Sequence, residues 1–446
     1  MFRKLIPKGE FTKSVLTLMT GNSIAQVIQL AVIPILARLY TPADFGIFAV
    51  YLSISTIIST VAAFRYDLAI MLPKSEKEAV DLLVLTVFLT FVVSALSFIA
   101  LLVLQPLINH FVQNKSIVKW LYYIPITIFF ATMYQIFNVW ANRKTRYKLM
   151  TASIISQRGS ISATNILMGL ARLGQAGLIF GNIIGQFVSV VILFVKSIGK
   201  DRKELSMTSL AGIRKVVSRY RKFPLFDSVN TIFFNFSTKG IIILLSKSFG
   251  DIVVGYYSMA ERVMLTPFNF FTAAFSQAFY QKLSHTYNFN RDNFNQLILQ
   301  AIHKIAQIIT IPYIVLVITS KWYIPVILGH EWDILFKYIF IFAPFVYISL
   351  TSSPYTHALK IINKQNIALY MNLVTFIIKF LSIIIPVWVF HMDILTTIII
   401  FSIVSFLSSL LAIIIINYYL KMAFSKFFAL VSLIAVLTYA GFFLIY

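Results

Sequence analysis

The stretch KSIGKDRKELSMTSLAGIRKVVSRYRK, residues 196–222, is the one long polar break in an otherwise apolar chain. It carries nine Lys and Arg residues against two acids, Asp201 and Glu204. It lies near the middle of 446 residues, with about six membrane-length segments before it. A polybasic central loop of this kind predicts two membrane-embedded halves joined on the cytoplasmic side.

The composition around this loop is that of an integral membrane protein. Hydrophobic residues make up 59% of the chain and charged residues 12%, with a mean hydropathy of +0.85, whereas soluble domains contain about 25% charged residues. Recurring apolar runs of about 20 residues predict transmembrane helices. The net charge of +23 lies in short loops between apolar runs, which argues against nucleic-acid binding. The absence of cysteine excludes disulfides and thiol catalysis.

Hydrophobic length predicts an all-α polytopic membrane protein with thirteen spans. We expect a six-helix lobe over residues 1–196, a basic cytoplasmic linker over 197–222, a second six-helix lobe over 223–420 and an additional C-terminal helix over 421–446. The predicted spans are 13–38, 45–64, 81–108, 117–140, 152–170, 175–196, 223–247, 252–280, 298–320, 333–358, 366–390, 394–418 and 424–446.

The distribution of Lys and Arg predicts a cytoplasmic N-terminus. In that orientation most cations fall on the inner side of the membrane. They lie at the N-terminus, in the central loop, and in the group Arg143, Lys144, Arg146, Lys148 and Arg158. Thirteen spans would then place Tyr446 outside.

Within the central loop, apolar residues alternate with cations at helical spacing. The apolar positions are Leu210, Ile213, Val217 and Tyr220. This pattern predicts an amphipathic basic helix suited to lie on an anionic inner leaflet.

A weak internal repeat supports the division into two halves. Residues 38–48, RLYTPADFGIF, align with residues 247–257, KSFGDIVVGYY, at an offset of about 209 residues. In each copy a cation ends one apolar segment, a short turn follows, and a glycine and an aromatic residue open the next segment. Because both halves begin on the same side, we expect a parallel repeat with its axis along the membrane normal.

Three N-terminal stretches resemble a known family. Gly21-Asn22, ARLYTPADFG at 37–46 and RYDLAIMLP at 65–73 are similar to the signature of the bacterial polysaccharide transporter family. Its members are O-antigen and capsule repeat-unit flippases of the multidrug/oligosaccharidyl-lipid/polysaccharide exporter superfamily. The resemblance implies two six-helix bundles facing a central cavity. It also implies alternating-access transfer of undecaprenyl-pyrophosphate-linked oligosaccharide to the outer leaflet, for lipopolysaccharide or capsule synthesis in the bacterial inner membrane.

Four ionisable residues near the middle of predicted spans stand out, all in the second half: Lys239, Glu261, Arg262 and Lys379. Such residues cost about 2.5–3.5 kcal/mol each on insertion scales, so they normally face protein or a water-filled cavity. Three cations and one acid near the midplane predict a site for a pyrophosphate headgroup. The alternative is a structural role, in which a Lys239–Glu261 pair locks a hairpin and the other cations snorkel.

The first half offers amides where the second offers charges. The predicted amide stripes, which line the cavity or bond between helices, are Asn22, Gln26 and Gln29 on the first span and Gln135, Asn138 and Asn142 on the fourth. Arg65 and Asp67 end the second span at the inner face, as membrane anchors or at the entry point of a headgroup. Gly177, Gly181 and Gly185 predict a close-packing face on the sixth span.

No enzyme signature is present, so we expect no catalytic residue, metal or cofactor. The expected partners are a lipid-linked oligosaccharide, membrane lipids and other polysaccharide-assembly membrane proteins. Three alternatives remain open: a multidrug exporter, a peptidoglycan lipid-precursor flippase of the same superfamily, and a membrane-embedded polysaccharide polymerase or ligase. A multidrug exporter would be expected to carry an acidic residue in the cavity of the first lobe. A polymerase or ligase would be expected to have a long outer loop.

Overall fold

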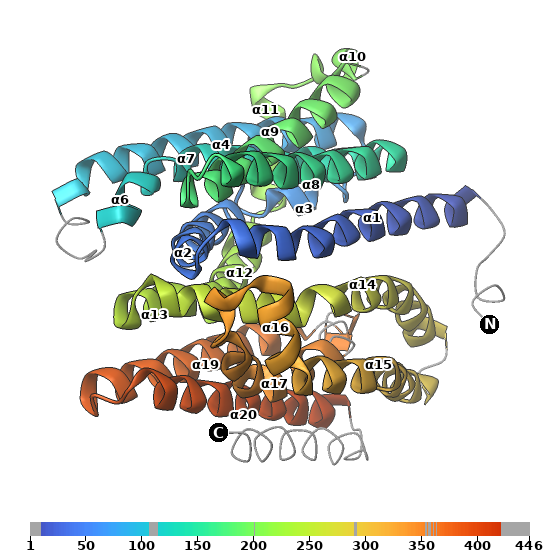
Figure 1. The fold of residues 1–446 in the computed structure, drawn as a ribbon. Coiled ribbons are helices and arrows are strands. Elements are labelled where there is room, and N and C mark those ends of the chain that lie inside the picture. Colours follow the sequence, from blue (N-terminus) through green and yellow to red (C-terminus); the bar gives the residue numbers. More distant parts are fainter. Residues whose placement is uncertain are drawn as a thin grey trace. The chain divides into compact units, whose positions relative to one another are not determined.

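The computed structural model describes residues 10–106, 115–199, 201–289, 292–352, 355, 358–359, 361–362 and 364–420. Every regular element in these residues is helical (Figure 1). The chain divides into two compact units. Unit 1 comprises Met1–Tyr40 and Ile47–Asn235, and unit 2 comprises Thr41–Gly46 and Phe236–Tyr446. The basic linker therefore belongs to unit 1, and the division falls at Asn235.

Unit 1 is built from helices that pack side by side. They are α1 (Glu10–Leu39), α2 (Pro42–Ser59, whose first turn belongs to unit 2), α3 (Tyr66–Ala69), α4 (Glu76–Val103), α6 (Lys115–Leu121), α7 (Ile124–Arg143), α8 (Tyr147–Leu170), α9 (Gln175–Ile198), α10 (Arg202–Leu205), α11 (Leu210–Arg219), η2 (Phe223–Asp227) and α12 (Ser228–Asn235).

Unit 2 is a second helical bundle. Its helices are η3 (Phe236–Gly240), α13 (Ile241–Phe249), α14 (Asp251–Phe289), α15 (Asp292–Ile318), α16 (Ser320–Leu328), η4 (His330–Trp332), α17 (Leu335–Thr351), α19 (Gln365–Ile384), η5 (Ile385–Val389) and α20 (Ile394–Leu420). Three of the short segments, η2, η3 and η5, are π-helical turns.

Twelve of the thirteen predicted spans coincide with helices, and the thirteenth lies outside the described residues. In the described part of the chain, nine helices are long and apolar enough to cross a membrane. The 17-residue α17 is apolar but short, and α8 and α14 do not meet this criterion. The chain is thus a multi-pass, all-α membrane protein.

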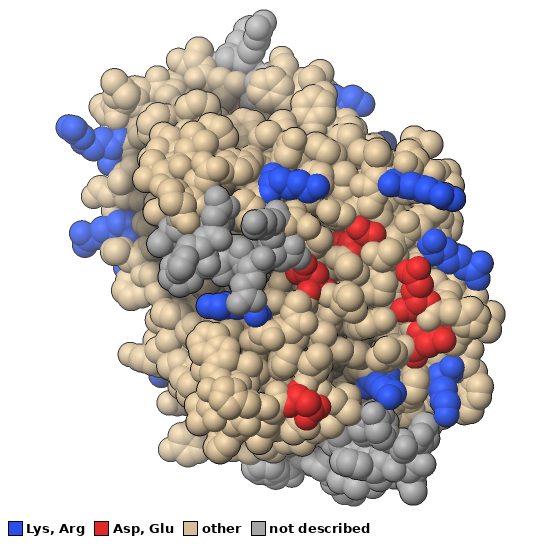
Figure 2. All heavy atoms as spheres, turned by 60° about the vertical axis from the view of Figure 1, so that its left-hand side comes forward, with Lys and Arg blue, Asp and Glu red and all other residues tan. Residues whose placement is uncertain are grey.

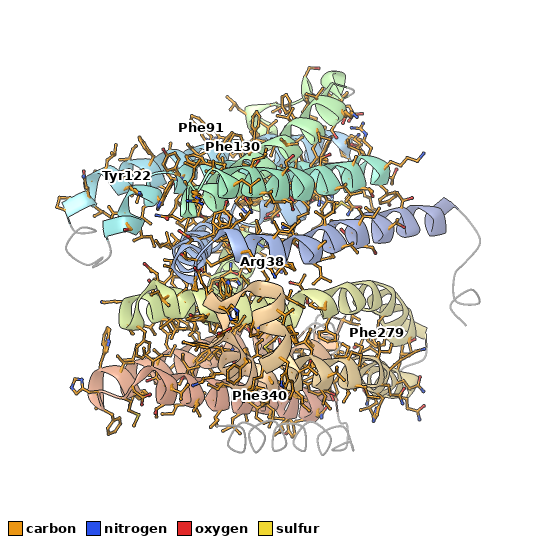
Figure 3. All side chains as sticks on the ribbon, viewed as in Figure 1. Arg38, Phe91, Tyr122, Phe130, Phe279 and Phe340 are labelled. Atoms are coloured by element: carbon orange, nitrogen blue, oxygen red, sulfur yellow. The ribbon has the colours of Figure 1, made fainter. Side chains whose placement is uncertain are left out.

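Large apolar side chains cover the outer surfaces of the helices. Phe91 of α4 is 63% exposed, while Phe130 of α7 packs edge-on against Phe187 of α9 with ring centroids 5.3 Å apart (Figure 3). Figure 2 shows wide areas without charge between scattered Lys, Arg, Asp and Glu side chains. An apolar surface this extensive is suited to lipid rather than to water.

The three predicted glycines of α9 pack closely on α8. A Cβ at Gly181 would collide with Oδ1 of Asn165, and one at Gly185 would collide with Ile161. A Cβ at Gly177 would meet the hydroxyl of Tyr40, which donates to the carbonyl of Asn165 at 2.6 Å. The close-packing face is therefore confirmed.

The internal repeat is visible as a reciprocal contact within unit 2. A Cβ at Gly46 would collide with the backbone of Asp251, and a Cβ at Gly255 would collide with the backbone of Pro42. At an offset of 209 residues, Pro42 corresponds to Asp251 and Gly46 to Gly255. The two copies therefore meet through equivalent positions, as two-fold symmetry requires.

The basic helix α11 packs on protein through its apolar side. Val216 is fully buried and Tyr220 nearly so, in a core that includes Leu82 of α4 and Trp140 of α7. Ile213 packs against the same core, whereas Leu210 is 86% exposed and Val217 is also exposed. The expected apolar stripe is thus divided, because one side of it completes the core of unit 1.

Candidate functional site

Lys379 and Glu261 lie close together inside unit 2. Lys379 on α19 is only 6% exposed, and its Nζ lies 4.7 Å from the centroid of the Phe345 ring on α17. Glu261 on α14 is near enough to interact electrostatically with Lys379. Among the described residues, no carboxylate lies within salt-bridge distance of Lys379. The ammonium thus lies on an aromatic face and feels the charge of Glu261, with no direct ion pair among the described residues.

Arg262 is next to Glu261 but contacts a different set of residues. Its guanidinium carbon lies 5.3 Å from the ring centroid of Phe45, in the segment Thr41–Gly46. Phe45 in turn packs edge-on against the buried Trp332, with ring centroids 5.5 Å apart. A cation over an aromatic face is stabilised by about 0.5–2 kcal/mol. This places Arg262 beside the repeat contact, whereas the charge of Glu261 acts on Lys379.

Lys239 is part-buried in the π-helical turn η3. This turn packs on α19, where Phe236 contacts Phe376 at 6.0 Å and a Cβ at Gly240 would press on Phe380. Lys239 therefore lies on an element that touches the helix carrying Lys379. The alternative Lys239–Glu261 lock is not present among the described ion pairs.

Arg65 and Asp67 form a buried group in unit 1 with an amide of α7. Asp67 is 1% exposed, and its Oδ2 accepts a hydrogen bond of 2.6 Å from Nε2 of Gln135. Burial raises the pKa of Asp67 above its ordinary value, although Arg65 and Gln135 both act to lower it. Phe64 and Arg65 adopt left-handed φ angles of 50° and 59°, which non-glycine residues rarely do.

Two atoms of this group lack partners within the described part of the chain. They are Nε of Arg65 and Oδ1 of Asp67, both buried. The nearby hydroxyl of Tyr66 donates to the carbonyl of Val217 at 3.2 Å, which ties α3 to α11. The Arg65–Asp67 group therefore lies at the end of unit 1 that carries the basic linker.

The predicted amide stripes have different environments. Gln135 is engaged between helices, as its bond to Asp67 shows. Asn22 on α1 is exposed, and Gln26 and Gln29 are part-buried. Within the described residues these three amides have no hydrogen-bond partner in unit 1, so their polar groups are available.

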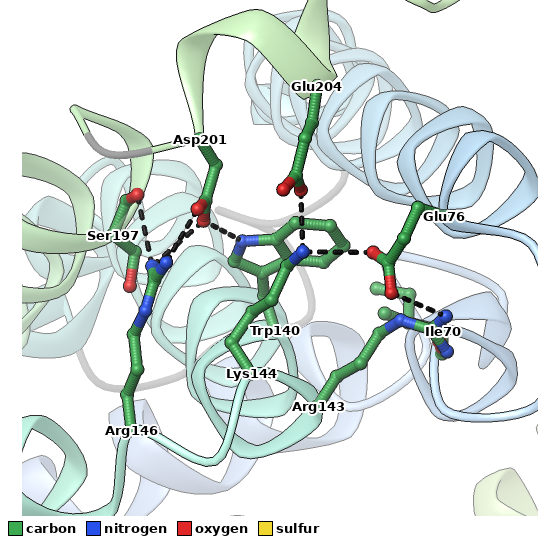
Figure 4. Close-up of polar contacts among 9 residues, drawn as sticks. All are labelled: Ile70, Glu76, Trp140, Arg143, Lys144, Arg146, Ser197, Asp201 and Glu204. Atoms are coloured by element: carbon green, nitrogen blue, oxygen red, sulfur yellow. Dashed lines mark hydrogen bonds and ion pairs between the residues drawn. The ribbon is translucent and has the colours of Figure 1, made fainter.

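A cluster that the sequence did not predict ties the linker to unit 1 (Figure 4). We call it the linker clamp: Glu76, Arg143, Lys144, Arg146, Asp201 and Glu204. Nη1 and Nη2 of Arg146 donate to the two carboxylate oxygens of Asp201 at 2.8 and 2.5 Å. Nε1 of Trp140 donates to the same carboxylate at 2.9 Å. Bidentate pairing of this kind fixes both distance and orientation.

Lys144 bridges the other half of the clamp. Its Nζ donates to Glu204 at 2.5 Å and to Glu76 at 2.9 Å. Burial by itself would lower the pKa of Lys144, but the two carboxylates raise it above its ordinary value. Burial would likewise raise the pKa of Asp201, but Arg146 and Trp140 hold it below its ordinary value. Both residues therefore stay charged over a wide pH range.

One predicted position requires correction. The charge distribution placed Arg158 with the cations of the inner side, but Arg158 is the twelfth of the 24 residues of α8, the middle of a long helix. Ionisable residues in mid-helix are thus not confined to the second half. Arg158 falls near the start of the predicted span 152–170, but α8 begins at Tyr147, five residues earlier, so the residue lies in the middle of the helix.

Comparisons with known proteins agree with this architecture. A family model described as polysaccharide biosynthesis protein matches residues 35–336, about two thirds of the chain. An inward-facing multidrug resistance MATE family transporter of the MOP superfamily has a TM-score of 0.61 at 14% identity, covering 91% of this chain and 94% of that one.

Two further solved structures show the same likeness. A MOP superfamily transporter from Pyrococcus furiosus, described as having a binding pocket of reverse polarity, gives a TM-score of 0.57 at 12% identity, with 92% and 96% coverage. An outward-facing MATE family transporter gives 0.56 at 13% identity, with 93% and 97% coverage. A search of curated proteins gives no match. At these identities the structures establish the fold, a two-bundle transporter fold.

Proposed function

The chain belongs to the polysaccharide biosynthesis protein family and has the fold of MOP superfamily transporters, and from this we propose that it is a lipid-linked oligosaccharide flippase. It moves undecaprenyl-pyrophosphate-linked repeat units from the inner to the outer leaflet of a bacterial cytoplasmic membrane. Its product supplies O-antigen or capsule assembly, and its N-terminus is cytoplasmic. Its partners are the lipid-linked substrate, membrane lipids and other polysaccharide-assembly membrane proteins.

The observation that carries this proposal is the environment of Lys379. A cation held in an apolar bundle is costly, and such residues commonly mark a substrate pathway. Lys379 is buried on an aromatic face and feels the charge of Glu261, but within the described part of the chain it has no direct ion pair. A pyrophosphate needs compensating charge to enter a low-dielectric interior, and an ammonium that is not tied to a carboxylate can supply it.

The other predicted residues have supporting roles in the proposal. Arg262 and Lys239 add positive charge to unit 2, while the amides Asn22, Gln26 and Gln29 bind sugar hydroxyls. Arg65 and Asp67 lie at the linker end of unit 1, where the headgroup enters if the linker is cytoplasmic.

The charge balance of unit 2 distinguishes a lipid-linked oligosaccharide flippase from the alternative of a multidrug exporter. An exporter of cationic drugs needs an acid that is not offset by nearby cations. Glu261 is near Lys379 and adjacent in sequence to Arg262, so its negative charge is offset. The surroundings therefore favour an anionic ligand.

The test measures translocation in cells whose own copy of the gene is deleted. Loss of the gene should trap lipid-linked repeat units on the inner leaflet, and the wild-type chain should restore their transfer. Lys379→Gln should lower transfer about tenfold or more, since a hydrogen bond to a charged group is worth about 1.5–3 kcal/mol. Lys379→Arg should retain most activity, and Lys321→Gln, an exposed cation of α16, should retain all of it.

A double variant separates substrate binding from a purely structural pair. If Lys379 only balances Glu261, the Lys379→Gln/Glu261→Gln protein should recover wild-type transfer, and the proposal would be wrong. Unpolymerised units reaching the outer leaflet in the deletion strain would indicate a polymerase instead. Orientation is checked with single cysteines at the exposed Ser218 and Lys321, because the chain has none of its own. An impermeant maleimide should label only Lys321→Cys in intact cells.

A further inference from the structure

Arg158 is a cation in the middle of unit 1 that the proposed function does not use. It is part-buried on α8, eleven residues after the first residue of that helix. At about 1.5 Å per residue this is roughly 16 Å along the helix axis. A guanidinium at that depth must meet other protein groups, water or a ligand.

The protein around Arg158 offers it no compensating acid. Among the described residues, no salt bridge or hydrogen bond involves its side chain, and the group that acts on it electrostatically is Tyr134 of α7. The cations of the linker clamp differ, because Arg143, Lys144 and Arg146 each pair with a carboxylate. Within the described part of unit 1, the clamp cations are already neutralised and Arg158 is not.

The packing of α1 on α8 sets Arg158 at the level of the amide stripe along the helix axis. Gly21 faces Thr151, whose Oγ1 donates to the carbonyl of Thr17 at 3.1 Å, and Gly169 faces Leu39. Both glycine contacts join residues about 130 positions apart, so the two helices run parallel in a constant register. Arg158 is then level with residue 28, between Gln26 and Gln29.

We propose that Arg158 binds the diphosphate of the lipid-linked substrate within unit 1, with the α1 amides Gln26 and Gln29 beside it. The inference rests on the proposed function, since it takes the same anionic headgroup as ligand. It adds an anion-binding residue to the unit in whose spans the sequence indicated amides rather than charges. A guanidinium and neutral amides at one depth suit a diphosphate that is joined to a sugar.

Binding of farnesyl diphosphate to the purified full-length protein in detergent tests the proposal. Isothermal titration should show Arg158→Gln weakening the affinity about tenfold or more, the effect of losing a charge-assisted hydrogen bond. Arg158→Lys should recover much of the affinity. Lys148→Gln, which removes an exposed cation from the first turn of α8, should match the wild type.

Two controls separate binding from folding. Neutral farnesol should bind Arg158→Gln and the wild type alike, because the headgroup is absent. Tyr134→Phe should leave diphosphate affinity unchanged; a loss as large as that of Arg158→Gln would show that Arg158 only positions Tyr134, and would overturn the proposal.

Wild-type affinity in Arg158→Gln would also overturn the proposal, while a loss confined to Lys379→Gln would leave the proposed function intact. A wild-type protein that binds no farnesyl diphosphate would contradict both.

Discussion

At the scale of single residues, the two units treat buried charge in different ways. In unit 2 an ammonium lies on an aromatic ring with an acid nearby, and in unit 1 a carboxylate is held by an amide and a neighbouring arginine. Each arrangement keeps part of the charge uncompensated, which costs stability. Such a cost is understandable where a ligand supplies the missing partner.

The carboxyl group of Asp67 should make stability depend on pH. Burial raises its pKa, so the folded protein favours the protonated form, and stability increases as pH falls through the folded pKa toward the ordinary value of about 3.9. Asp67→Asn mimics the neutral acid and still accepts from Gln135. The variant should unfold at a higher temperature than the wild type at about pH 8, with the gap narrowing toward about pH 5. Asp333→Asn, which alters an exposed carboxylate, should show no such gap; a constant gap for Asp67→Asn would contradict the prediction.

The sequence identified some site residues and not others for definite reasons. Lys379 and Glu261 stood out because a charge within an apolar run is visible in one dimension. Their proximity depends on the packing of α14 against helices far along the chain, which no local pattern encodes. The contact of Arg262 with Phe45 spans more than 200 residues and was equally inaccessible. Arg158 was grouped with the inner cations because the predicted span began five residues late, which placed this residue near the start of the helix rather than in its middle.

At the scale of elements, the linker clamp should control the stability of the linker. Arg146→Ala leaves the Asp201 carboxylate, 4% exposed, with the Trp140 donor alone, and should cost about 2–3 kcal/mol. The linker should then be cleaved faster by trypsin, and the unfolding temperature in detergent should fall. Arg219→Ala removes a pair with Glu78 whose arginine is 57% exposed, and should cost less than about 1 kcal/mol.

The effect of Arg146→Ala should disappear in acid. The pKa of Asp201 is lowered, so its contribution is present above the ordinary value of about 3.9 and is lost as pH falls through the folded value. Wild type and variant should therefore begin to converge as pH falls below the ordinary value and should coincide once pH is below the folded pKa. A difference that persists there would show that Arg146 acts through packing instead.

The sequence was most informative about where the helices lie along the chain. The length of a span follows from the hydrophobicity of the sequence, so helices are present at twelve of the predicted spans. Their ends were less accurate where polar residues continue a helix, as in the 39-residue α14, which runs on to Phe289. The π-helical turns η2 and η5 contain Pro224 and Pro386, which disrupt regular helical bonding. The turn η3 has no proline, and nothing in its sequence marked it.

At the scale of the whole molecule, the repeat predicts equal effects at Gly46 and Gly255. Each lacks room for a Cβ because backbone atoms of the other copy occupy the space. Gly46→Ala and Gly255→Ala should each destabilise the protein by about 1–3 kcal/mol, the typical cost of overpacking. Gly159→Ala on α8, where nothing lies within 4 Å of the added carbon, should be neutral or stabilise slightly. Unfolding temperatures in detergent measure all three, and unequal losses at Gly46 and Gly255 would contradict the symmetry.

The same glycine contact carries information about ancestry. Equivalent residues that meet reciprocally form the contact expected between two identical half-length chains in a symmetric homodimer. Duplication and fusion of a gene for such a half-length protein would preserve the contact in one chain. The halves could then diverge elsewhere, one acquiring Lys379 and Glu261 and the other Arg158, while each glycine remained constrained by the backbone of the opposite copy, Gly46 by Asp251 and Gly255 by Pro42.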